Sequence, residues 1–279
     1  MKIAISVESS ADLSAELKNK FNITSVPLTI VLGDEEIVDS EDAGKQIFEF
    51  VSKTKIMPKT CAVNEYQFKE YFENLLKNYD EVVHLSMSSD ISCTYKNAIS
   101  ATENLKKVHV IDTRSLCGGI ALLAIYAAKL AKQGLSSKEI VQKVSDRIND
   151  VQLNFIPNKL DYLRHGGRCS MLQMLGANLL KIHPTITMAN GKTRVGKKYI
   201  GTMDSCFKKL CEDVIRKNNP DKSVAIIAYT TITQKQLDFA YDFLREQGFE
   251  EIYDIVANGT ISSHCGESAM GIMFLNNKK

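Results

Sequence analysis

The first half of the chain alternates short apolar runs with amphipathic segments, and this alternation constrains the fold more than any other feature. Apolar runs of strand length lie at Lys2–Val7, Val26–Leu32, Glu81–Leu85 and Val108–Asp112. Segments with helical periodicity or capping signals follow them. Strands that alternate with helices in this way predict a parallel sheet with helices on both faces. In such sheets, ligands bind at the loops that follow the carboxyl ends of the strands.

The second half has a different pattern, because a hairpin signal appears among its helices. Asn190-Gly191 separates the segments Ile182–Met188 and Lys192–Ile200, and this dipeptide is typical of a two-residue turn. Hairpins mixed with helices predict a two-layer α+β domain. We therefore expect an α/β protein of two domains. Residues 1–153 should form a three-layer α/β/α domain with a parallel sheet, and residues 154–279 a two-layer α+β domain with a mixed sheet.

The composition argues against several classes of function. The formal net charge is only +2, so we expect no nucleic-acid partner and only transient contact with membranes. The seven cysteines are an odd number without a CxxC pair, which predicts neither a disulfide framework nor a metal site. No signal-peptide core and no apolar run long enough to cross a bilayer is found, so we expect a cytoplasmic protein.

Hydroxyl groups are concentrated between Ser86 and Thr94, directly after an apolar strand. A helix-like segment follows from Ser92, so the free N–H groups of its first turn and the hydroxyls would point to one place. This arrangement suits an anion such as a carboxylate or a phosphate. A helix cap with a polar turn also explains the stretch and needs only one hydroxyl. Spacing alone therefore leaves both interpretations open.

A second polar concentration, TISSHCGE at residues 260–267, contains the histidine that is best placed for polar chemistry, His264. A hydrolase of an ester or thioester would need Ser92 or Cys93 as nucleophile and His264 as base. The sequence has no GxSxG motif, so this enzyme stays an alternative. The nucleotide motifs GxGxxG and GxxxxGK[ST] are also missing, and we expect no cofactor.

Six motifs, in this order and spacing, resemble the DegV family of bacterial fatty-acid-binding proteins, which includes the lipid-binding subunits of fatty acid kinase. The resemblance covers essentially the whole chain. The motifs are SSADL at 9–13, PKT at 58–60, SSDISCTYKNA at 88–98, VIDTRSLCGG at 110–119, LRHGGR at 163–168 and SSHCGESAMG at 262–271.

The resemblance implies that a long-chain fatty acid lies in a tunnel between the domains. It implies that the carboxylate is held by Thr60 with its neighbour Cys61, by Ser92 with the backbone of Cys93, and by His264. The protein would not be an enzyme itself. It would present the carboxylate to a separate ATP-dependent kinase subunit and then carry the acyl phosphate. A binder of another anionic amphiphile is a further alternative.

Three positions differ from the pattern of the family. Cys93 stands where the family usually has glycine, and its side chain is expected to narrow the mouth of the pocket. Glu267 replaces a proline of the C-terminal motif. The family often has a Lys-Tyr-Arg-Gly run, and Ile200 takes the place of its arginine here. Because that arginine is associated with the kinase step, Ile200 is expected to affect this step and to leave lipid binding intact.

Overall fold

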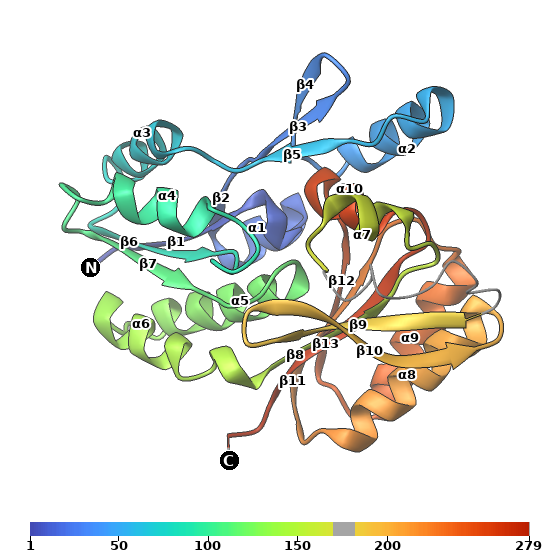
Figure 1. Cartoon of the computed structure of the whole chain (residues 1–279). Coiled ribbons are helices and arrows are strands. Elements are labelled where there is room, and N and C mark those ends of the chain that lie inside the picture. The colour runs from blue at the N-terminus through green and yellow to red at the C-terminus, as the bar shows by residue number, and fades with distance from the viewer. Residues whose placement is uncertain (170–181, 279) are drawn as a thin grey trace.

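The computed structural model describes residues 1–169 and 182–278, and Figure 1 shows how their elements are arranged. The described residues form an α/β protein of two domains, one built on a four-stranded parallel sheet and the other on a six-stranded mixed sheet. A small antiparallel sheet of three strands lies beside them. The predicted fold class is therefore confirmed.

The parallel sheet has the strand order β2-β1-β6-β7. In its centre, Ile5 of β1 lies opposite Ile23 of β2 and Val83 of β6. Helices α3 and α4 cover one face of the sheet, and α5 and α6 cover the other (Figure 1). The elements of this domain are β1 (Ile3–Glu8), η1 (Ser9–Ala11), α1 (Ala15–Phe21), β2 (Ile23–Val26), α3 (Glu65–Leu75), β6 (Glu81–Ser86), α4 (Thr94–Ala101), β7 (Val108–Asp112), α5 (Gly118–Lys132), α6 (Ser137–Ser145) and η2 (Ile148–Asp150).

The mixed sheet has the order β10-β9-β8-β13-β11-β12, and α8 and α9 pack against it. The predicted hairpin joins β9 to β10, and Asn190 and Gly191 both have the positive φ that its two-residue turn requires. The elements are β8 (Val151–Ile156), α7 (Asp161–Gly166), β9 (Ile182–Ala189), β10 (Lys192–Ile200), α8 (Met203–Lys217), β11 (Pro220–Tyr229), α9 (Gln234–Glu246), β12 (Glu251–Val256), α10 (Gly259–Cys265) and β13 (Met270–Asn276). Since β8 pairs along its whole length with β13, we propose that the domain boundary precedes Val151 rather than following residue 153.

The small sheet, of order β4-β3-β5, differs from the sequence prediction. It contains β3 (Thr29–Leu32), β4 (Glu35–Val38) and β5 (Lys59–Cys61), with α2 (Ala43–Thr54) beside it. The run 26–32 was predicted as one strand, but it divides at Pro27-Leu28 between two sheets. The sequence pattern does not predict a strand at the PKT motif, but Thr60 pairs with Ile30 in a strand of three residues. So short a strand shows no periodicity, and its pairing partner lies far away in the sequence.

Helix α5 is buried on almost all sides because it lies between the two larger sheets. It contacts β1 and β6 of the parallel sheet, and β8, β11 and β13 of the mixed sheet. A Cβ atom on Gly118 would lie 3.0 Å from Cγ2 of Ile226, so this helix approaches the mixed sheet closely. One apolar core therefore runs through both domains. The sequence has another long apolar segment, SMLQMLGANLLKI from residue 170, which would suit a buried helix or the lining for an apolar ligand tail. Its residues Met171 and Met174 lie outside the described residues.

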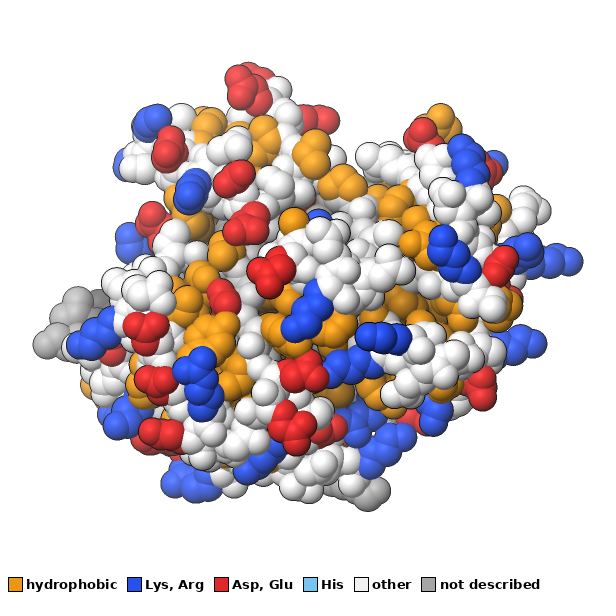
Figure 2. All heavy atoms as spheres, turned by 180° about the vertical axis from the view of Figure 1, so that it is seen from behind, with side chains coloured by type: hydrophobic (Ala, Val, Ile, Leu, Met, Phe, Trp, Pro, Cys, Tyr) orange, Lys and Arg blue, Asp and Glu red, His pale blue; other side chains and the backbone are white. Residues whose placement is uncertain are grey.

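The surface is mixed in charge. Figure 2 shows acidic and basic side chains interspersed over the rear face, with apolar patches between them, as expected for a net charge of +2. Within the described ranges, no helix is long and apolar enough to cross a membrane.

Candidate functional site

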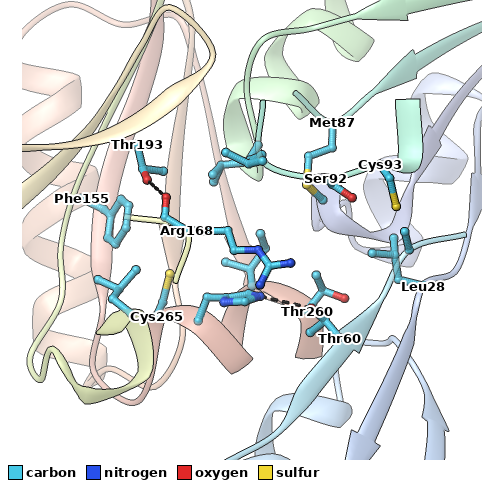
Figure 3. Close-up of a pocket in the computed structure, with 16 residues that line it drawn as sticks. Leu28, Thr60, Met87, Ser92, Cys93, Phe155, Arg168, Thr193, Thr260 and Cys265 are labelled. Carbon is cyan, nitrogen blue, oxygen red and sulfur yellow. Dashed lines mark hydrogen bonds between the residues drawn. The ribbon is translucent and has the colours of Figure 1, made fainter. Parts of the chain in front are cut away.

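A cavity of about 170 Å³ lies between the two domains, at the carboxyl ends of the parallel strands. Met87 and Ser92 follow β6, and Leu116 follows β7. Phe155 and Arg168 approach from the other domain (Figure 3). The sequence predicted a site at this edge of the sheet, and the cavity lies there because parallel strands bring their following loops together.

The cavity brings together two of the predicted residues that lie 204 positions apart. Oγ1 of Thr60, on β5, is 3.2 Å from Nε2 of His264, on α10 (Figure 3). Antiparallel pairing with β3 places Thr60, and α10 packs against both of these strands. The PKT motif and the C-terminal motif therefore form one polar end of the cavity.

The ring of His264 is enclosed, and its charge state follows from that. Burial, with smaller contributions from the nearby Arg168 and His165, lowers the pKa of His264 to about 4. The ring is therefore neutral at neutral pH. A Cβ atom on Gly166 would lie only 2.1 Å from Nδ1 of His264. This close approach explains why the LRHGGR motif has a glycine at this position.

Ser92 lines the cavity and also serves the helix start. Its Oγ accepts a hydrogen bond from the backbone N–H of Thr94 at 3.2 Å and lies 2.6 Å from Oγ1 of Thr94. Helix α4 begins at Thr94, two residues later than predicted, with Cys93 as its N-cap residue. Ser92 therefore forms a local turn at the helix start and lines the cavity, but the N-cap residue is Cys93, and the anion-binding interpretation stays a prediction.

The two cysteines predicted at the site lie in different places. Cys93 lines the cavity and is exposed. Cys61 is also exposed, but it does not line the cavity. The reason is the alternation of side chains along β5, which turns Cys61 to the face opposite Thr60.

The buried carboxylate of Glu8 fixes the start of the loop that carries Ser92. Glu8 accepts hydrogen bonds from Ser86 Oγ at 2.5 Å and from the backbone N–H of Met87 at 2.9 Å. His84 Nε2 lies 3.1 Å from the same carboxylate, and its Nδ1 lies 2.8 Å from Ser6 Oγ. His84 is fully buried and does not line the cavity, so its role is structural.

Arg168, Thr193 and Thr260 also line the cavity, although they were not predicted as site residues. Figure 3 shows the Arg168 side chain extending into the cavity toward Thr260, and its charge acts on His264. Arg168 Nη1 donates to the carbonyl of Gly166 at 2.8 Å, and the residue is exposed. It brings a positive charge to the polar end. The LRHGGR motif was the one signal that could have marked it.

The described residues do not assemble the nucleophile and base of a hydrolase. The recorded hydrogen bonds of the Ser92 side chain go to Thr94, and that of the His264 ring goes to Thr60. A Ser–His or Cys–His pair within hydrogen-bond reach is the defining feature of that alternative.

An apolar cleft adjoins the cavity and shares four lining residues with it, Leu116, Phe155, Ile261 and Cys265. It continues past Ala228, Ala257, Met270 and Met273 toward β11 and β13. The combined space is therefore polar at the end of Thr60 and His264, and apolar at the other end.

The fold and this site define a class: a two-domain α/β protein whose interdomain cavity has a polar end and an apolar end. The family profile described as "Uncharacterised protein, DegV family" matches residues 2–277. The chain belongs to the DegV family.

Related proteins agree with this assignment. A DegV domain-containing protein of Caldanaerobacter subterraneus is 30% identical over 98% of both chains. A fatty acid-binding protein of Thermotoga maritima is 31% identical over 76% of this chain and 77% of its own. The crystal structure of a DegV lipid binding protein from Thermotoga maritima has a TM-score of 0.88 and 25% identity, and covers all of both chains.

Proposed function

We propose that this protein binds and carries a long-chain fatty acid and does not itself catalyse a reaction of it. The carboxylate would lie at the polar end of the cavity, against Thr60, Ser92 and His264, with Arg168 as its counter-charge. The observation that carries the proposal is the pairing of hydroxyls, a neutral imidazole and a guanidinium at one end with an apolar cleft at the other. The relatives described as fatty acid-binding and lipid binding support it.

The energetics favour such a ligand. Hydrogen bonds that involve a charged group contribute roughly 1.5–3 kcal/mol each, and a neutral His264 has one N–H to donate. Each buried methylene of the tail adds about 0.8 kcal/mol. The cavity of about 170 Å³ is smaller than typical ligand pockets of roughly 300–1,000 Å³. A long acyl chain would therefore have to continue into the apolar cleft and widen it, because the cleft has a volume of only about 20 Å³.

The direct test is to purify the protein gently and to identify its bound small molecule by mass spectrometry. A fatty acid is expected, and its absence would contradict the proposal. The double variant Thr60→Ala/Ser92→Ala should reduce the occupancy at least several-fold, because the carboxylate loses two hydroxyl partners. Ser145→Ala, which removes an exposed hydroxyl at the end of α6, is the matched control and should leave occupancy unchanged.

The two exposed cysteines offer an independent test of where the ligand lies. Cys93 lines the cavity and Cys61 does not, although Cys61 adjoins Thr60 in sequence. Bound fatty acid should therefore slow the alkylation of Cys93 and leave the alkylation rate of Cys61 unchanged, as measured by peptide mass spectrometry. Equal protection of both thiols would argue against a carboxylate at the polar end of this cavity.

The proposal extends to the presentation of the carboxylate to a separate kinase subunit. A carboxylate oxygen would attack the γ-phosphorus of ATP on that subunit, ADP would leave, and an acyl phosphate would form. Ile200, at the end of β10, is 69% exposed where the resemblance leads us to expect arginine. Acyl phosphate, trapped with hydroxylamine, should form faster with Ile200→Arg than with the unchanged protein. Equal rates of acyl phosphate formation would show that residue 200 does not affect the kinase step.

A further inference from the structure

The tip of the β9–β10 hairpin is attached to the N-terminal domain by contacts that the proposed function does not use. Ser88 Oγ, fully buried, donates to the carbonyl of Gly191 at 2.7 Å. Arg114 Nη2 donates to the carbonyl of Asn190 at 2.6 Å and pairs with the carboxylate of Asp90 at 2.7 Å. We call these five residues the hairpin clasp.

The clasp is closely fitted. Arg114 has a φ of +53°, a conformation that is costly for a residue with a side chain, and its backbone N–H donates to Asp112 at 3.0 Å. A Cβ atom on Gly191 would lie 2.7 Å from both Cζ of Arg114 and Oδ2 of Asp90. The turn therefore needs glycine for close approach as well as for its φ of +77°.

The clasp joins two walls of the cavity. On one side, Ile91 and Ser92 line the cavity directly after Asp90. On the other side, Thr193 lines it two residues after Gly191, and Thr193 Oγ1 donates to the carbonyl of Arg168. Ser92, which carries a hydroxyl, and Arg168, which carries the guanidinium, thus lie on opposite sides of the hairpin clasp.

We propose that the hairpin clasp sets the rate at which the bound fatty acid leaves the cavity, with Arg114 as its positioning residue. This inference rests on the proposed function. The walls that carry Ser92 and Arg168 can separate only if the hairpin tip leaves Ser88, Asp90 and Arg114. The Arg114–Asp90 pair lies within the N-terminal domain and holds the guanidinium against the hairpin, and Lys192 of the hairpin lies 3.8 Å from the same Asp90 carboxylate across the domains. Because these side chains are 27–62% exposed, salt screens both attractions. Ligand release should therefore accelerate as ionic strength rises.

The test measures dissociation of a labelled fatty acid into an excess of unlabelled fatty acid. Arg114→Gln should release the ligand about tenfold faster than the unchanged protein at low salt. Raising the salt to about 1 M should accelerate release from the unchanged protein and have a smaller effect on Arg114→Gln, which keeps only the Lys192–Asp90 pair. Arg114→Lys, which keeps the charge and loses the planar fork, should give an intermediate rate. Arg245→Gln removes a similar exposed ion pair on α9 and should change nothing.

Two outcomes separate this inference from the proposed function. If the unchanged protein retains no fatty acid, the proposed function fails. If it retains fatty acid and Arg114→Gln releases it at the same rate, the clasp inference fails alone. Hydrogen exchange in protein without added lipid gives a second reading. Arg114→Gln should expose the amides of the hairpin tip, and unchanged protection there would also overturn the inference.

Discussion

At the scale of single residues, His264 shows how the site depends on exclusion of water. Its ring is enclosed by Gly166 on one side and Thr60 on the other. Its low pKa keeps the ring uncharged at neutral pH, which leaves Arg168 as the positive charge of the polar end. An anion of charge −1 would suit this site. Its charge would balance the single positive charge of Arg168, and the neutral His264 would add a hydrogen bond without adding charge.

The pKa of His264 predicts a pH dependence of stability. The ring has a pKa of about 4 in the folded protein against the ordinary 6.5. Between these values the unfolded chain binds a proton and the folded chain does not, so the free energy of unfolding should fall as pH falls from 7 to 4. The loss attributable to His264 is at most about 3 kcal/mol, at roughly 1.4 kcal/mol per pKa unit.

Urea unfolding at several pH values would measure this slope. His264→Gln should flatten it, whereas His183→Gln, a change on β9 outside the cavity lining, should leave it as it is. An unchanged slope in His264→Gln would show that the pH dependence arises from other groups.

At the scale of elements, the N-terminal end of α10 is positioned by a buried carboxylate, that of Asp39. Asp39 accepts hydrogen bonds from Ser9 Oγ at 2.6 Å and from the backbone N–H of Thr260 at 2.8 Å. Burial raises the pKa of Asp39, because the ionised carboxylate loses solvation there. The hydrogen bonds from Ser9 and Thr260 stabilise the ionised form and offset part of this effect. Because α10 carries His264, Asp39 influences the site without lining it.

Asp39→Ala should lower the free energy of unfolding by about 2 kcal/mol, because two buried donors lose their acceptor at roughly 1–3 kcal/mol each and the removed charge offsets part of that loss. It should also reduce fatty acid occupancy through the displacement of α10. Thermal denaturation and mass spectrometry would measure both effects. Asp42→Ala, next to α2, removes an exposed carboxylate without a cap hydrogen bond and should have little effect. Unchanged stability of Asp39→Ala would contradict this role.

At the scale of the whole molecule, α5 makes the two domains one folding unit. The helix belongs by sequence to the N-terminal half, yet it forms part of the core under the mixed sheet. The cavity lies between domains that share this helix. Apolar packing of α5 against both sheets therefore resists relative motion of the domains. The hairpin clasp is a second attachment between the domains, at the cavity itself.

Leu123→Ala, a change at a fully buried position of α5, should destabilise both domains together by about 2–5 kcal/mol. Unfolding should stay a single transition when followed by circular dichroism and by hydrogen exchange in each sheet. Two separate transitions, or a loss confined to one sheet, would contradict the shared core. Lys132→Ala, at the exposed end of the same helix, is the control and should change stability by less than about 0.5 kcal/mol.

The sequence by itself determined the features that act over a few residues. Strand–helix alternation predicted the parallel sheet, Asn190-Gly191 predicted the hairpin, and the hydroxyls after β6 marked one wall of the cavity. Tertiary structure alone decided that 59–61 is a strand, that Cys61 faces away from the cavity, and that the charge of Arg168 acts on His264. The reason is physical: periodicity and turn chemistry are local, whereas these outcomes depend on packing between segments up to 204 residues apart.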